Sequence, residues 1–207
     1  RLARCFGNHI ADTTEAGGDY RNAPSLARDG FPEILLLDTE LKADPRQTAV
    51  WHTDVTFTEN PPIGSLFVME IAAQTGGDTM WSNQIKALAA LSAPIREFIG
   101  GLSANHGRPP ATGTSVHPMV REHHSTGEKV LFVNRGWTNS IVGLKPLESM
   151  HLLEVIHQTS ERPELQTRWK WTSGDAALWD NRYTMHYAVN DYHGQRRRAR
   201  RATIYNV

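Results

Sequence analysis

The sequence predicts a mainly β fold with flanking helices, arranged as one β-barrel or jelly roll over residues 1–207. Many short segments alternate apolar and polar residues with a period of two, and glycine, proline and aspartate turns separate them. A few helical patterns interrupt these segments. Neither an internal repeat nor a change in composition divides the chain, so we expect a single domain.

The predicted elements of the first half begin with a buried strand in the apolar run at residues 34–37. Residues 50–57 and 65–72 both alternate, and each is predicted to be a strand. Residues 103–115 are rich in glycine and proline, so we expect a loop that could serve as a mobile lid.

Three segments carry helical signals. Ser82 or Asn83 can cap a helix with apolar residues at helical spacing, and Pro94 can begin a second helix that ends at a pair of glycines. Pro146 opens a longer helical pattern that ends before Pro163. We expect these helices to support the β structure from outside.

The remaining segments are predicted to be extended. They comprise residues 116–120, a strand at 130–133 that follows a hairpin turn, segments around 169–171 and 176–179, and alternating residues between 183 and 205.

The composition excludes several classes of protein. Lys+Arg and Asp+Glu number 22 each, so a formal net charge of zero gives no global signal for nucleic acid or an anionic membrane. No apolar run has the length of a membrane helix. Cys5 is the only cysteine, which excludes an intrachain disulfide and a zinc–thiolate cluster and favours a reducing, cytoplasmic location.

His52 and Asp54 are the first candidate metal ligands. On a strand, residues two apart point to the same side, as two ligands of one ion require. His186, in a distant segment, could supply the third ligand. Two imidazoles and one carboxylate suit non-haem Fe(II), because they leave positions open for a co-substrate and O₂. Zinc would accept the same ligands, and a hydrogen-bonded surface pair is the commoner explanation of so short a pattern.

The arginine run at residues 196–201 is the second candidate. With strand alternation, Arg197 and Arg201 share one face with Ala199 between them, which leaves room for an anion. The other arginines are expected to face solvent. A nucleic-acid-binding patch is the alternative, but the neutral overall charge disfavours it. The third candidate is the turn before Thr79, whose hydroxyl could donate to a bound carboxylate.

These motifs together resemble the taurine dioxygenase family of Fe(II)- and 2-oxoglutarate-dependent dioxygenases. The similarity runs in order from about residue 31 to the end: WHTDVTF at 51–57, GGDT at 76–79, WDNR at 179–182, HYA at 186–188 and QRRRARRATI at 195–204. Relatives in this family act on taurine, alkyl sulfates and 2,4-dichlorophenoxyacetate.

The resemblance implies a double-stranded β-helix, the jelly roll of cupin-like proteins, with His52, Asp54 and His186 as iron ligands. It implies that Arg197, helped by Thr79, binds the distal carboxylate of 2-oxoglutarate. Arg201 would face the anionic group of the substrate or the inner carboxylate of the co-substrate.

The implied reaction is hydroxylation of a small anionic substrate with formation of succinate and CO₂. A sulfonate or alkyl sulfate would then release sulfite or sulfate and leave an aldehyde. A carboxylate or amino-acid-like substrate is the alternative within the same chemistry, and a non-catalytic or zinc-binding cupin-like module is the alternative from another class.

The substrate side of the site departs from the taurine-specific pattern. Trp137 is expected to wall the substrate pocket. Thr48 stands where taurine-specific members have asparagine, and Ala11 and Thr14 replace a histidine and a tyrosine of the family. We expect that the family's N-terminal segment and part of its lid around residues 105–116 are absent. The expected assembly is a homo-oligomer, a dimer or tetramer, without nucleic-acid or membrane partners.

Overall fold

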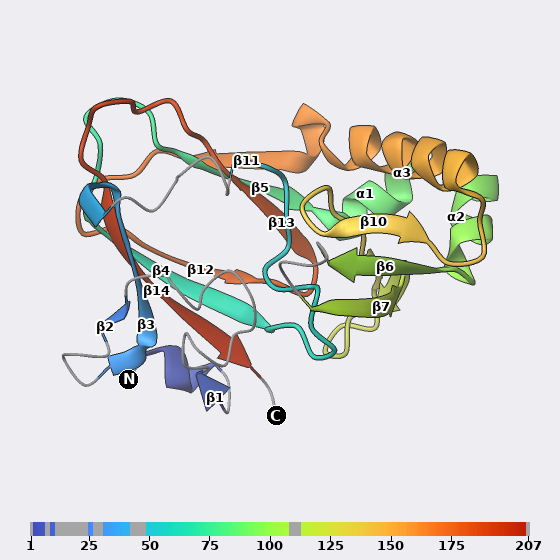
Figure 1. Cartoon of the computed structure of the whole chain (residues 1–207), viewed down its shortest axis with the longest axis horizontal. Helices are drawn as coiled ribbons and strands as arrows, with labels where there is room; N and C mark the ends of the chain where they lie inside the picture. The colour runs from blue at the N-terminus through green and yellow to red at the C-terminus, as the bar shows by residue number, and fades with distance from the viewer. Residues whose placement is uncertain are drawn as a thin grey trace.

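The computed structural model describes residues 2–6, 9–10, 25–26, 31–41, 49–107 and 113–205. Within this part the fold is mainly β with three α-helices, which confirms the predicted class (Figure 1). A six-stranded antiparallel sheet has the order β12-β4-β14-β3-β2, and β1 pairs with β14. Its strands are β1 (His9–Ile10), β2 (Ser25–Leu26), β3 (Phe31–Asp38), β4 (Gly64–Ile71), β12 (Ala176–Asp180) and β14 (Arg198–Tyr205).

A second antiparallel sheet has the order β11-β5-β13. It consists of β11 (Gln166–Trp169), β5 (Thr79–Asn83) and β13 (Thr184–Ala188). Aromatic rings fill the space between the two sheets: the ring of Trp81 on β5 lies 5.7 Å from that of Trp179 on β12, and the ring of Trp171 lies 5.0 Å from that of Phe67 on β4. The sheets therefore face each other across an aromatic core, as Figure 1 shows for β5 and β4.

The helices gather at one end of the molecule, beside a third sheet and a hairpin (Figure 1). They are α1 (Gln84–Ala90), α2 (Ala93–Gly100) and α3 (Pro146–Ser160), beside β6 (Ser103–Gly107), β7 (Thr114–Pro118), β10 (Thr138–Ile141) and the hairpin of β8 (Val120–Glu122) and β9 (Lys129–Leu131). Short 3₁₀ helices occupy Leu2–Cys5, Thr39–Leu41 and Pro163–Leu165. Asn83 caps α1 as predicted, because its side chain accepts a hydrogen bond from Lys86 N at 3.0 Å.

A buried apolar cluster joins this helical end to its strands. Leu88 of α1, Ile99 of α2 and Ile156 of α3 pack together with Ala104 of β6 and Leu131 of β9. The helices thus buttress the β structure from one end, as the sequence predicted. None of the helices that the structure describes combines the length and apolar character needed to span a bilayer.

Two predictions of local structure are wrong. Residues 50–57 do not form a strand: His52 makes an isolated bridge to His186, and the chain then turns at residues 54–57. Residues 103–115 are not a continuous loop, because β6 and β7 pair antiparallel across its two ends. The tip of the predicted lid, residues 108–112, lies outside the described residues.

The predicted faces of the arginine run are confirmed. Arg201 is buried, whereas Arg198 and Arg200 lie on the outer side of β14. Both of these arginines, and Arg196 just before the strand, pair with nearby carboxylates. Asp38 accepts from Arg196 at 3.1 Å, and Glu70 accepts from Arg198 at 2.7 Å and also pairs with Arg200. These carboxylates therefore offset much of the positive charge of the run.

Candidate active site

The three predicted metal ligands lie together in the interior. His52, Asp54 and His186 are all buried, and their ligand atoms lie within 4.8 Å of one another. Asp54 Oδ1 is 3.7 Å from His52 Nε2 and 3.8 Å from His186 Nε2. Two imidazole nitrogens and one carboxylate oxygen on a single ion form a facial triad, so the donor set fits Fe(II).

Backbone pairing brings the two histidines together. His52 N donates to His186 O at 3.0 Å, and His186 N donates to His52 O at 2.7 Å. His52 Nδ1 lies 2.8 Å from the carbonyl oxygen of Val50, and since a carbonyl only accepts, this nitrogen carries the proton. The lone pair of His52 Nε2 is therefore directed to the side of Asp54, as metal binding requires.

Burial and charge set the ionisation of the triad. Burial raises the pKa of Asp54, but the positive charge of Arg201 and the neighbouring imidazoles outweigh it and lower the pKa well below its usual range. Burial also lowers the pKa of His186 to about 3, with a contribution from His52. At neutral pH the site thus presents an anionic carboxylate and neutral imidazole, the forms that bind a divalent metal.

A turn, rather than a strand, carries Asp54. Val55 has a positive φ of 57°, which is unusual for a β-branched residue, so the neighbouring contacts must hold the backbone there. Asn181 provides one clamp: its Oδ1 accepts from Asp54 N at 2.9 Å and its Nδ2 donates to Asp54 O at 3.1 Å. Ser65 donates to Asp54 Oδ2 at 3.0 Å and so positions the second carboxylate oxygen.

A buried histidine network holds the other end of this turn. His117 Nε2 lies 2.8 Å from Thr56 O and 3.0 Å from Thr58 O, and His106 Nδ1 lies 2.9 Å from Thr56 Oγ1. Asn134 also donates to Thr56 Oγ1, at 3.2 Å. These buried polar groups satisfy one another and so support the conformation of the turn.

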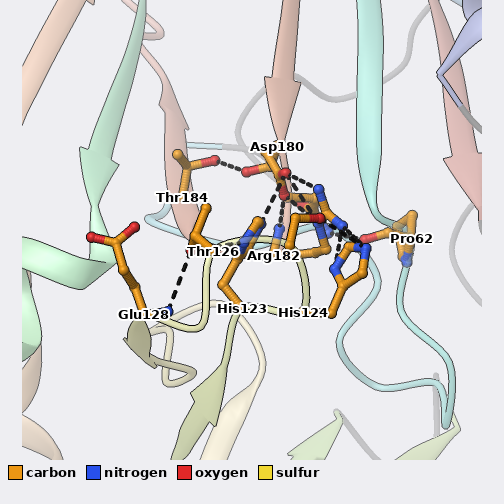
Figure 2. A network of polar contacts seen from close by, with 10 residues as sticks. Pro62, His123, His124, Thr126, Glu128, Asp180, Arg182 and Thr184 are labelled. Atoms are coloured by element: carbon orange, nitrogen blue, oxygen red, sulfur yellow. Dashed lines mark hydrogen bonds and ion pairs between the residues drawn. The ribbon is translucent and has the colours of Figure 1, made fainter.

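The residues on either side of Asn181 contact the turn of the β8–β9 hairpin (Figure 2). Arg182 Nε donates to both carboxylate oxygens of Asp180, at 2.8 and 3.0 Å, and its guanidinium also contacts the ring of His124. His123 Nε2 lies 3.3 Å from Asp180 Oδ2. This segment therefore has two roles: Asp180 and Arg182 hold the β8–β9 hairpin, and the buried Asn181 supports the candidate metal ligand Asp54.

The predicted 2-oxoglutarate residues lie on the facing sheets. Thr79 begins β5, and its hydroxyl oxygen accepts a hydrogen bond from Trp171 Nε1 at 2.9 Å, which leaves its own proton available for donation. Arg197 precedes β14, and it makes no ion pair with a carboxylate in the described part of the chain. Arg201 donates to Asp54 Oδ1 at 3.0 Å, so it reaches the triad itself.

The predicted substrate residues are less closely connected to the triad. Trp137 packs edge-on against Phe57, with ring centroids 4.6 Å apart. Phe57 belongs to the turn that begins at Asp54. Thr48, Ala11 and Thr14 lie outside the described residues. A surface cavity of about 790 Å³ lies between β10 and α3, and none of the triad residues lines it.

Sequence reasoning did not identify Asn181, Ser65 or Trp171 as functional residues. Asn181 occurs within a segment that resembled the family, but nothing local showed what its side chain would contact. The roles of Asn181 and Trp171 depend on hydrogen bonds to residues far away in the chain, and Ser65 reaches Asp54 across the turn that no local pattern predicted.

Comparison with known proteins agrees with this geometry. The family model described as "Taurine catabolism dioxygenase TauD, TfdA family" matches residues 1–203. The chain is 36% identical over 199 residues to an alpha-ketoglutarate-dependent sulfate ester dioxygenase of Pseudomonas putida, covering 85% of this chain and 65% of that protein. It is 32% identical over 225 residues to an alkylsulfatase of Acinetobacter baylyi, covering 95% of this chain and 70% of that protein.

Solved structures are also similar. A taurine dioxygenase from Burkholderia xenovorans superposes with a TM-score of 0.78 and 40% identity, covering 86% of this chain and 64% of that one. The chain thus spans about two thirds of the length of these relatives. A family model that matches nearly the whole sequence, on a fold that solved relatives share, establishes that the chain belongs to the taurine catabolism dioxygenase TauD, TfdA family.

Proposed function

We propose that the chain is an Fe(II)- and 2-oxoglutarate-dependent dioxygenase acting on a small anionic organic substrate. The buried triad of His52, Asp54 and His186 is the observation that carries this proposal. Iron bound there would supply O₂ activation coupled to the oxidative decarboxylation of 2-oxoglutarate to succinate and CO₂. We also propose that the two facing sheets belong to a double-stranded β-helix.

The residues of the chain bind and orient the reactants. Arg197 offers a planar fork that matches the distal carboxylate of 2-oxoglutarate, and Thr79 can add a hydroxyl donor to the same group. The aromatic core between the sheets excludes water around these polar groups, which strengthens each charge pair.

Arg201 would meet a second anion, because it already lies at the triad through Asp54. A substrate sulfonate or sulfate, or the inner carboxylate of 2-oxoglutarate, has the geometry for its guanidinium. The relatives in Pseudomonas putida and Acinetobacter baylyi are named for sulfate esters and alkyl sulfates, so we favour a sulfate ester or sulfonate substrate. Hydroxylation of the carbon that bears the sulfur group would release sulfate or sulfite and an aldehyde. Trp137 and Thr48 are the proposed substrate contacts.

The proposal is tested by succinate formation that depends on the substrate. A panel of alkyl sulfates, sulfonates and aryloxy acids, followed by 2-oxoglutarate-coupled O₂ uptake, would identify the substrate class. His186→Ala should abolish turnover, whereas the matched control His193→Ala, at an exposed position, should leave it unchanged. Normal turnover in His186→Ala would refute the assignment. A weak visible band on anaerobic addition of Fe(II) and 2-oxoglutarate distinguishes this enzyme from a zinc-binding module.

A further inference from the structure

The glycine turn that precedes β5 is built around a carboxylate from a distant segment. Gly77 N donates to Asp191 Oδ1 at 2.7 Å. Gly76 and Gly77 both have positive φ, at 74° and 71°, and a Cβ added to Gly76 would lie 2.3 Å from Asp191 Oδ1. The two glycines are therefore required both for the backbone conformation and for the close approach of Asp191.

The carbonyl group of the same glycine contacts Arg197. Gly77 O accepts a hydrogen bond from Arg197 Nε at 3.2 Å. A Cβ on Gly77 would lie 3.1 Å from the ring of Tyr192 and 3.2 Å from Arg197 Cδ, so the backbone is enclosed by these side chains. Asp191, the Gly77 backbone and Arg197 thus form a continuous series of hydrogen bonds.

This series determines the orientation of the Arg197 side chain. Thr39 Oγ1 accepts a hydrogen bond from Arg197 N at 3.0 Å, and Thr39 N donates to Arg197 O at 3.1 Å. These two bonds position the Cα atom of Arg197. Among the described residues, Gly77 O is the only polar group that the structure places in contact with the guanidinium of Arg197. The aromatic rings of Phe67 and Tyr192, with centroids 5.5 and 5.7 Å from Arg197 Cζ, pack on it without directing its fork.

Arg168 shares its charge between two carboxylates beside this turn. It donates to Asp78 Oδ2 at 2.6 Å and lies 3.7 Å from Asp191 Oδ2. Its charge therefore offsets only part of the negative charge of Asp191, whose other oxygen accepts from the Gly77 amide. The terminal nitrogens of Arg197 make no hydrogen bond among the described residues, so they can donate to an anion.

We propose that Asp191 is a positioning residue for 2-oxoglutarate, acting through the Gly77 peptide on Arg197. This inference rests on the proposed role of Arg197 in co-substrate binding. A charge-assisted hydrogen bond is strong enough to change a binding constant about tenfold. Asp191→Ala should therefore weaken 2-oxoglutarate about tenfold, and Asp191→Asn, which keeps a neutral acceptor, should weaken it less than about threefold.

Calorimetric titration of 2-oxoglutarate into Mn(II)-loaded protein measures this binding without turnover. Gln195→Ala is the matched control, since Gln195 ties the outer end of the same turn through Gln74 N and Thr75 N, at 2.7 and 3.2 Å, without touching Gly77. We expect this control to bind 2-oxoglutarate like the wild type. In steady-state assays Asp191→Ala should raise KM for 2-oxoglutarate and leave KM for the other substrate and kcat nearly unchanged.

The outcomes separate this inference from the proposed function. If the wild type does not bind 2-oxoglutarate, or if Arg197→Ala binds it normally, the proposed function fails.

If Arg197→Ala loses binding while Asp191→Ala keeps it, or if Gln195→Ala weakens binding as much as Asp191→Ala, the positioning role is refuted. If circular dichroism shows that Asp191→Ala is unfolded, the test compares the 2-oxoglutarate affinity of Asp191→Asn with that of Gln195→Ala. A loss in the asparagine variant larger than about tenfold would then show that charge, not the hydrogen bond, matters.

Discussion

Replacing Asn181 by alanine tests whether the backbone around Asp54 creates the metal site. The Asn181 side chain, 1% exposed, makes three hydrogen bonds, to Asp54 N at 2.9 Å, Asp54 O at 3.1 Å and Pro62 O at 3.0 Å. Its removal leaves three buried backbone groups without this partner. At about 1 kcal/mol for each group, the free energy of unfolding should fall by about 3 kcal/mol. Metal affinity should fall about tenfold, because the carboxylate loses its orienting support.

Two measurements check this prediction. Urea denaturation of the metal-free protein gives the change in unfolding free energy, and titration with Mn(II) gives the metal affinity. Arg182→Gln is the matched control: it alters the adjacent residue, whose side chain contacts Asp180 and His124 (Figure 2). Metal affinity should stay within about twofold in this control. Wild-type metal affinity in Asn181→Ala would refute the reasoning, whatever the loss of stability.

Three further changes have defined outcomes. A Cβ at Gly136 would lie 2.6 Å from His52 Cβ, so Gly136→Ala should displace the ligand and weaken Mn(II) binding about tenfold in the same titration. Trp171→Phe removes the N–H that donates to Thr79, so 2-oxoglutarate affinity should fall about fivefold by calorimetry. Burial lowers the pKa of His157 to about 4 from 6.5, so the unfolded chain takes up a proton first as pH falls. Unfolding free energy should therefore drop by about 2 kcal/mol from about pH 7 to about pH 5, and His157→Asn should lack this contribution in urea titrations.

Matched controls accompany these three changes. Gly100→Ala adds a methyl group where no atom lies within 4 Å, so it should not affect metal binding. Trp81→Phe alters a ring in the same aromatic core without removing the donor to Thr79, and 2-oxoglutarate affinity should be retained. His151→Asn, at an exposed position of α3, should keep the wild-type pH dependence. Equal effects in a variant and its control would contradict the corresponding explanation.

The sequence predicted the members of the site better than the backbone that carries them. His52, Asp54 and His186 do come together, but the alternation of residues 50–57 suggested a strand, whereas Val55 adopts a positive φ. Val55 is β-branched and suits a strand locally. Contacts from Asn181 and His117 outweigh that preference, and no local pattern reveals them.

The prediction of a continuous loop at residues 103–115 was wrong for a similar reason. The glycines and prolines of this segment favoured a loop, but Ser103–Gly107 and Thr114–Pro118 pair as β6 and β7, and β10 extends their sheet. The contact of Asp191 was likewise not predictable from local sequence, since its partner Gly77 lies far away in the sequence. The arginine run was predictable because strand alternation alone separates its buried and exposed members.

The reciprocal backbone bridge between His52 and His186 has a consequence for biosynthesis. Because His186 lies far downstream of His52, a ribosome must synthesise the whole chain between them before the triad can be completed. Until then the Asp54 turn also lacks Asn181, so an incomplete chain has neither the ligands nor the clamp. Loading with metal must follow synthesis of the C-terminal strands, and a bound ion would then hold the early and late parts of the chain together like a reversible cross-link.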